Sequence, residues 1–305
     1  MAAAHRRSGR KAKRLPWRDY LQRAISAILR CGQLRFVARQ LARTAHVPWS
    51  ILERVPVEGT FEVNLQGRQF IYESSLYDAV GRRLFWTRSQ DYEADTFRAL
   101  TRLLRPGVFL DVGANTGIFS LFAAQFEGVV CHAFEPSPEV FSVLQRNAVT
   151  NGMQDRIVCQ RMAVGASTGF VRLHIPDRNW SSATLDEQGF RGATGHVQQV
   201  ECTTLDDYVR QRNLRDVIAI KVDVEGFEHV VVQGSRNLLE RDRPAVICEC
   251  LEESQPAELT RIFRELGYAW FQIGPNGAIR CETFAADAAG EPVNYLFLPT
   301  DGRDR

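Results

Sequence analysis

The stretch from Val108 to Ile118 constrains the fold of this chain more than any other. Five residues of strand-like apolar character, Val108 to Val112, run into the loop Gly-Ala-Asn-Thr-Gly at 113–117. Helical spacing of apolar residues then begins at Ile118. A buried strand, a tight loop and a helix N-terminus present free backbone N–H groups to a ligand. The pattern therefore predicts a nucleotide-sized binding site at the end of this strand.

Two further positions narrow the class of ligand. Glu135 ends the next predicted strand, 22 residues after Gly113, where a doubly wound fold places the acid that binds ribose hydroxyls. A dinucleotide loop G-x-G-x-x-G would need glycines at 115 and 118, but Asn115 and Ile118 stand there. Because the middle glycine lets the backbone approach a pyrophosphate, NAD and FAD are disfavoured. Asp111 at the strand end, the glycine loop and Glu135 together suit S-adenosyl-L-methionine. This ligand joins adenosine to an amino acid and contains no phosphate.

Strands and helices alternate along the rest of the chain. This order predicts an α/β fold, a Rossmann-like, doubly wound and mostly parallel sheet with an antiparallel edge hairpin. The strands are expected at 108–112, 129–134, 157–162, 217–223 and 245–250, with a final pair at 268–273 and 294–298. Two extra strands, 170–175 and 197–203, bracket an irregular loop. Helices are expected after Pro138, from Gly226 to Leu239 and at 257–266.

Three regions are expected. Residues 1–55 form a basic arm and an amphipathic helix, residues 56–105 an N-terminal cap, and residues 106–300 the S-adenosylmethionine-binding domain. Within the cap, 57–73 reads as a hairpin that turns at Gln66-Gly67, 78–86 as irregular, and 92–104 as a helix.

Basic charge is concentrated in the arm. Residues 1–50 carry twelve Lys/Arg and one acid, a net charge of +11, so the remaining 255 residues carry 2 − 11 = −9. A helix is expected from about residue 15 to 45, with apolar residues on one face and arginines around it. Three roles fit this helix: it would contact an anionic membrane peripherally, bind nucleic acid, or pack on the body of the protein. An organelle transit peptide would look similar. We expect membrane contact rather than nucleic acid.

Composition indicates a cytoplasmic protein, with membrane association only through that helix. No apolar run reaches the roughly 18 to 20 residues that span a bilayer, and the start lacks a secretory signal. The seven cysteines are scattered and include no Cys-x-x-Cys pair, which indicates reduced, mostly buried thiols.

Four motifs together resemble the FkbM-type methyltransferases, a class I family that depends on S-adenosylmethionine. They are Phe109–Ile118, Ala133–Pro138, Thr204–Asp207 and Ile220–Glu228, and the resemblance covers roughly residues 90 to 275. It implies a division of roles among the cofactor-binding residues. Glu135 would accept both ribose hydroxyls, Asn115 and Thr116 would meet the methionine carboxylate, and Gly113 and Gly117 would allow the close turn. Asp111 would orient the loop or the ligand's ammonium, and Glu93 with Tyr92 would be a lid or merely a helix start.

Asp223 and Glu225 are the predicted catalytic residues. They stand two apart on an extended segment, so both side chains leave the same face, at the carboxyl end of the strand beside the cofactor strand. A carboxylate there would orient an acceptor hydroxyl and take its proton. Asp223 would alternatively only brace the cofactor's amine. His229 is expected to pack or cap rather than to act as a base.

The same segment favours oxygen as the acceptor atom. The Asp/Asn-Pro-Pro-aromatic tetrapeptide of enzymes that methylate exocyclic base amines is absent, and there is no Pro-Cys dipeptide for cytosine-C5 chemistry. Asp223, Glu225 and Glu249 would offer oxygen ligands to Mg²⁺, but no spacing demands it, so no metal site is predicted. The loop 179–182 is either an acceptor lip or a surface turn.

These observations predict an S-adenosylmethionine-dependent O-methyltransferase. Its acceptor would be the hydroxyl of a small molecule or glycan, namely a sugar, a glycolipid or a secondary metabolite. The alternatives are a methyltransferase that reaches RNA or another macromolecule through the basic arm, and a non-catalytic membrane- or nucleic-acid-binding module.

Overall fold

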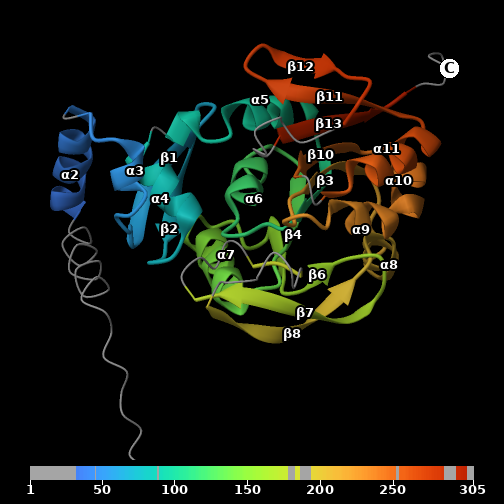
Figure 1. The fold of residues 1–305 in the computed structure, drawn as a ribbon, viewed down its shortest axis with the longest axis horizontal. Coiled ribbons are helices and arrows are strands. Elements are labelled where there is room, and N and C mark those ends of the chain that lie inside the picture. The colour runs from blue at the N-terminus through green and yellow to red at the C-terminus, as the bar shows by residue number, and fades with distance from the viewer. Residues whose placement is uncertain are drawn as a thin grey trace, which may run out of the picture.

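The computed structural model describes residues 32–44, 46–87, 89–177, 183–185, 194–251, 254–284 and 293–300. In these residues an eight-stranded sheet lies at the centre, in the order β12-β11-β13-β10-β9-β3-β4-β5 (Figure 1). Five strands run parallel: β3 (Gly107–Val112), β4 (Val129–Phe134), β5 (Ile157–Gln160), β9 (Val217–Val222) and β10 (Ala245–Cys250). Antiparallel pairing adds β13 (Val293–Pro299), β11 (Tyr268–Gly274) and β12 (Gly277–Arg280). The fold is the predicted Rossmann-like one, mostly parallel with an antiparallel edge, although β12 itself was not predicted.

Helices cover both faces of this sheet. One apolar cluster joins it to α5 (Ala94–Leu103), α6 (Ile118–Ala123) and α7 (Pro138–Thr150). A second cluster joins the opposite face to α8 (Leu205–Gln211), α9 (Glu228–Gln233), α10 (Arg236–Asp242) and α11 (Pro256–Glu265). Neighbouring residues of β3 belong to different clusters, because successive side chains of a strand point to opposite faces of the sheet. Phe109 lies in the first cluster and Leu110 in the second. From β3 the chain continues to β4 and β5 on one side of the sheet and then to β9 and β10 on the other. Such a reversal of strand order leaves a crevice at the carboxyl end of β3.

The predicted hairpin is present and is fixed to the core by two amide side chains. It consists of β1 (Gly59–Leu65) and β2 (Arg68–Ser74). Asn151 of α7 accepts from the Ile71 N–H at 2.8 Å and donates to the Ile71 carbonyl at 2.6 Å. Asn147, one turn earlier, accepts from the Glu73 N–H at 2.6 Å. The outer edge of β2 has no neighbouring strand in its sheet, so these side-chain amides provide the hydrogen bonds that a neighbouring strand would otherwise make.

The interpretation of 78–86 as irregular was wrong. This segment forms helix α4 (Ala79–Trp86), and its N-terminus is capped by Asp78, whose Oδ1 accepts from the Gly81 N–H at 2.9 Å. Eight residues are too few for helical periodicity to stand out, but the capping aspartate was a usable signal. Helix α5 follows a short 3-10 turn (Ser89–Asp91) and begins directly after Tyr92-Glu93, as predicted.

The extra strands form a separate sheet. β7 (Gly169–Pro176) and β8 (Gly195–Thr203) pair antiparallel, and the short β6 (Ala163–Val164) joins β8 in parallel. The predicted loop 179–182 lies outside the described residues. The helix expected from Gly226 to Leu239 is divided into α9 and α10 at Gly234, where an added Cβ would overlap the backbone oxygen of Gly165.

Only the end of the predicted N-terminal helix lies within the described residues. It forms α2 (Gly32–Thr44), followed by the single turn α3 (Trp49–Leu52). Residues 1–31 are outside them. Across the described part of the chain, no helix has both the length and the apolar character that crossing a bilayer would require.

Candidate functional site

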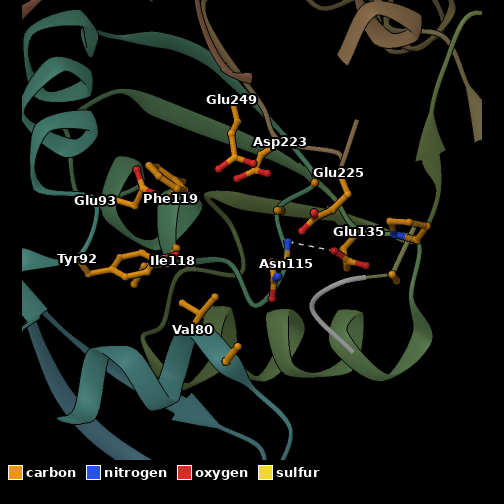
Figure 2. Close-up of a pocket in the computed structure, with 15 residues that line it drawn as sticks. Val80, Tyr92, Glu93, Asn115, Ile118, Phe119, Glu135, Asp223, Glu225 and Glu249 are labelled. Carbon is orange, nitrogen blue, oxygen red and sulfur yellow. Dashed lines mark hydrogen bonds between the residues drawn. The ribbon is translucent and has the colours of Figure 1, made fainter. Parts of the chain in front are cut away.

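A cavity of about 280 Å³ opens at the carboxyl ends of β3, β4, β9 and β10 (Figure 2). Its floor comes from the loop after β3 and the first turn of α6. One wall comes from the N-terminal cap, through Ala79 and Val80 of α4 and Tyr92-Glu93 before α5. The lining residues are Ala79, Val80, Tyr92, Glu93, Gly113, Ala114, Asn115, Ile118, Phe119, Glu135, Pro136, Ala183, Asp223, Glu225 and Glu249.

The glycine loop has the close packing that its sequence predicted. Gly113 has φ +77°, and an added Cβ would overlap the backbone oxygen of Asp223. The Asp223 N–H in turn donates to the Val112 carbonyl at 3.0 Å. Gly117 has φ +91° and packs against Leu144 of α7 rather than lining the cavity. The loops after β3 and β9 are therefore locked together, and only a glycine fits at 113.

Asn115 and Glu135 are joined directly across the cavity floor. The Asn115 N–H donates to Glu135 Oε2 at 3.1 Å, and the Ser137 N–H donates to Oε1 at 2.8 Å. Each carboxylate oxygen keeps a further lone pair for a ligand, because an ionised carboxylate offers about four acceptor positions. Burial raises the pKa of Glu135 to about 7, although both N–H donors oppose this.

Two predicted cofactor residues do not reach the cavity with their side chains. Asp111 is buried beneath the loop, where its Oδ2 accepts from the Ser120 hydroxyl at 2.6 Å, and burial raises its pKa to about 6. The Thr116 hydroxyl is buried and hydrogen-bonds to the Tyr72 hydroxyl on β2. Tyr72 also donates to Asp78 at 2.9 Å, so Thr116 ties the loop to the N-terminal cap. The Asp111 side chain thus contacts helix α6, and both of its predicted roles stay predictions.

Asp223 lies at the opposite end of the cavity from Glu135, beside a buried lysine. Lys221 Nζ is 3.0 Å from Asp223 Oδ2, and the Lys221 side chain is almost completely buried. Its ammonium also lies 5.1 Å from the centre of the Phe119 ring. Burial opposes the charge of Lys221, but Asp223, Glu249 and Glu93 outweigh burial and raise the pKa of the lysine above its ordinary value.

Glu249 on β10 stands next to Asp223. The register of β9 and β10 pairs Cys248 with Val222, which brings the two following acids together, and their carboxyl groups lie side by side in Figure 2. Burial and the Asp223 charge raise the pKa of Glu249 from its ordinary 4.5 to about 9. The raised pKa favours the protonated carboxyl of Glu249, which would donate a hydrogen bond to Asp223.

Glu225 lies on the rim between Asp223 and Glu135. Its backbone has φ +54°, and its side chain reaches solvent through the mouth of the cavity. Loss of solvent around the carboxyl group, and then the negative charges of Asp223 and Glu228, raise the pKa of Glu225 to about 7. The buried Glu228 fixes this turn, because its Oε1 accepts from the N–H groups of Val224 at 3.0 Å and Gly226 at 3.3 Å.

Glu93 and Tyr92 form part of the cavity wall on the side of the N-terminal cap. Glu93 Oε2 accepts from Thr96 Oγ1 at 2.8 Å and from Asn294 Nδ2 on β13 at 2.9 Å. Burial raises the pKa of Tyr92. The structure thus brings both residues to the cavity, whereas their sequence also allowed a plain helix start.

His229 does not line this cavity. A second, smaller cavity of about 40 Å³ adjoins the first and shares Gly113, Pro136 and Ala183 with it. Its other walls are apolar, from Phe134, Met162, Ala163, Val164, Leu173, Val224 and Phe227 among others. Among the residues described, no group of three or more His, Cys, Asp or Glu is arranged to hold a metal ion.

Sequence reasoning missed Lys221 and Glu228, and it considered Glu249 only as a metal ligand. Lys221 carried a visible signal, since it is the one charged residue in the otherwise apolar strand Val217–Val222. A buried lysine needs a partner, and Asp223 two residues later is on the same face. Glu249 gave no such signal, because its place depends on which strand lies beside β9.

Comparison with known proteins identifies the family of this chain. A family model described as the methyltransferase FkbM domain matches residues 111–269, more than half of the chain. The chain is 31% identical over 159 residues to 31-O-demethyl-FK506 methyltransferase FkbM of Streptomyces tacrolimicus, over 43% of this chain and 60% of that protein. It is 28% identical over 155 residues to methyltransferase sdnD of Sordaria araneosa, over 41% of this chain and 59% of that one. The match therefore spans less than two thirds of these curated relatives.

Among solved structures, a methyltransferase FkbM from Methylobacillus flagellatus KT aligns over 72% of this chain and 53% of that one, with 15% identity and a TM-score of 0.43. The family implies the use of S-adenosylmethionine. On the extent of the family match, the chain belongs to the methyltransferase FkbM domain family.

Proposed function

We propose that the cavity binds S-adenosylmethionine and that Asp223 accepts the proton of a hydroxyl that is methylated there. The observation that carries this proposal is the continuity of the cavity, which joins Glu135 at one end to Asp223 at the other across the glycine loop. Glu135 would accept the two ribose hydroxyls with its remaining lone pairs. The apolar lining of the adjoining cavity suits contact with one face of a flat heterocycle such as adenine.

The charge of the lining supports a cationic ligand. Five of the described residues that line the cavity are acids, namely Glu93, Glu135, Asp223, Glu225 and Glu249, and none of the described lining residues is a lysine or an arginine. Glu249 adds negative charge only when it is ionised. Lys221 lies beneath them, where it compensates part of this charge. S-adenosylmethionine supplies a methyl group on a cationic sulfur, together with an ammonium group, and both cations suit such surroundings. The same lining disfavours acceptors that carry phosphate or carboxylate next to the reacting atom.

A hydroxyl is the acceptor that best suits Asp223. Transfer forms a bond between the methyl carbon and the acceptor oxygen, while the sulfur keeps the electron pair of the broken bond. The hydroxyl proton must then leave, and Asp223 would take it. Lys221 and Glu249 hold the Asp223 carboxyl from two sides and so fix its direction. The name of the Streptomyces relative describes action on a 31-O-demethyl compound, which agrees with oxygen as acceptor.

Ligand binding tests the cofactor half of the proposal. The protein should show a rise in unfolding temperature with S-adenosylmethionine and with its demethylated product. Glu135→Ala should lose most of that rise, whereas Glu240→Ala, a change to an exposed acid on α10, should keep it. A folded wild-type protein without any shift would exclude the cofactor site.

Turnover tests the acceptor half. Incubating labelled S-adenosylmethionine with extracts and separating the products by mass spectrometry should reveal methylated hydroxyl compounds. Asp223→Asn should bind S-adenosylmethionine within a few-fold of the wild type but methylate at least about a hundredfold more slowly. Unchanged turnover would remove Asp223 from the reaction.

A further inference from the structure

Helix α2 carries apolar side chains on a face that no described residue covers. Leu34, Val37 and Leu41 are 49%, 50% and 62% exposed. Their spacing of three and four residues places them in one stripe along the helix. In the next helical turn, α3, Trp49 and Ile51 are also exposed.

This exposure is concentrated in one part of the molecule. Ten large apolar side chains are exposed among the described residues, and five of them lie between residues 34 and 51. Single exposed apolar residues are ordinary on a protein surface, whereas a run of them marks an interaction site. The stripe on α2 therefore requires an explanation that the other five positions do not.

Two residues attach α2 to the body, Arg39 from the side opposite the stripe and Ala38 from its flank. The Arg39 guanidinium donates to the Thr87 carbonyl at 3.4 Å and lies 5.5 Å from the centre of the Phe85 ring on α4. Ala38 packs against the apolar cluster of the cap. Figure 1 shows α2 at the outer edge of the molecule, beyond α3 and α4. The helix is thus attached to the body at Ala38 and Arg39, while Leu34, Val37 and Leu41 keep about half of their surface exposed.

Charge identifies the kind of surface that would cover this stripe. Residues 1–50 contain twelve Lys/Arg and one acid, while the rest of the chain has a net charge of −9. An anionic bilayer offers acidic head groups to the basic residues and acyl chains to the apolar ones, so both features are used. A nucleic acid would use the basic residues alone and would leave the leucines and the valine in water.

We propose that α2 and α3, in a chain whose first 50 residues carry a net charge of +11, dock the protein on a bilayer that contains anionic phospholipid. The docked helix would lie one short helix away from the cavity. The C-terminal end of α4 contacts α2, and its N-terminal residues Ala79 and Val80 line the cavity wall. Docking would therefore hold the cavity within reach of hydroxyl compounds at the membrane surface.

Vesicle co-sedimentation with the full chain tests this proposal. Wild-type protein should sediment with vesicles of phosphatidylglycerol and phosphatidylcholine, and much less with phosphatidylcholine alone. Raising the salt from about 0.1 M to about 0.5 M should weaken binding, since screening shortens the reach of the basic residues. The variant Leu34→Ser, Val37→Ser, Leu41→Ser should bind at least about tenfold more weakly, because it has lost the apolar contact.

A matched control separates this stripe from apolar exposure in general. Val149→Ser, Phe170→Ser, Ile279→Ser changes three side chains that are each more than 60% exposed elsewhere, and it should bind vesicles like the wild type. Both triple variants should keep the thermal shift with S-adenosylmethionine, so this test is independent of the proposed cofactor site.

Several results would overturn the docking proposal. One is equal binding by the α2 variant and the wild type. Another is equal binding to neutral and anionic vesicles. If the protein binds RNA and not vesicles, the basic arm binds nucleic acid. If it does not bind vesicles and the α2 variant changes from dimer to monomer, the stripe is a contact between two copies of the chain.

Discussion

The raised pKa of Glu249 makes a sharp prediction about stability. Its pKa is raised from 4.5 to about 9 by burial and by Asp223, so the native protein holds a proton there that the unfolded chain releases above about pH 4.5. A group whose pKa is raised on folding lowers the free energy of unfolding as pH increases between these two values. Glu249→Gln keeps the shape and an N–H donor for Asp223 but needs no proton.

The magnitude follows from the pKa shift. At pH 7 the wild type holds the proton about 2.5 pH units above its ordinary pKa, and each unit corresponds to about 1.4 kcal/mol. Glu249→Gln should therefore raise the free energy of unfolding by about 3 kcal/mol at pH 7. The gain should fall below about 1 kcal/mol at pH 5, because there the unfolded chain holds most of the proton as well.

Urea unfolding at pH 5, 7 and 8.5 measures this difference, provided that the transition is two-state. Glu240→Gln, an exposed acid on α10, serves as the control and should change stability by no more than about 0.5 kcal/mol at each pH. A variant that is destabilised at pH 7, or whose gain is the same at all three values, would refute the assignment of the proton to Glu249.

Three other changes test the same site. Lys221→Met removes the cation 3.0 Å from Asp223 and should destabilise the protein by about 3 kcal/mol at pH 8 but less at pH 5, where the acids take up protons; urea unfolding at both values checks this. In the proposed site the ribose hydroxyls need an ionised Glu135, whose pKa is about 7. The affinity for S-adenosylmethionine should therefore fall up to tenfold for each pH unit below 7. Calorimetry that shows no pH dependence would contradict this role of Glu135. Gly113→Ala should abolish cofactor binding and destabilise by more than about 2 kcal/mol, whereas Gly152→Ala, also at positive φ but in open space, should cost about 1 kcal/mol, as thermal unfolding can measure.

The order of strands and the cavity floor were predictable from sequence because both depend on local patterns. The apolar strand before Gly113, the turn at positive φ and Glu135 at the end of the next strand are each encoded within a few residues. The parallel sheet then brings successive strand ends to one edge without further information. The contact between Asn115 and Glu135 is a direct consequence.

The direction of individual side chains was not predictable in the same way. Thr116 and Asn115 are neighbours in one loop, yet the Thr116 hydroxyl turns to Tyr72 of a hairpin more than forty residues earlier. Nothing in the loop sequence specifies that contact, because it depends on how the cap docks. The docking itself rests on Asn147 and Asn151, whose amides looked like ordinary helix residues until β2 was placed beside them.

The acids of the cavity connect stability with the proposed reaction. Four of the acids at the site (Asp111, Glu135, Glu225 and Glu249) have raised pKa values, so each lowers the stability of the ligand-free protein as pH increases. A core selected for stability alone would replace them with neutral side chains. Glu135 and Glu225, together with Asp223, instead place carboxyl groups where a cationic ligand would lie, and Lys221 offsets only part of their negative charge. Such a fixed arrangement stabilises a positive ligand without reorganising when it binds, which is the electrostatic form of preorganisation. The instability of the empty site and its affinity for a cation thus have one cause.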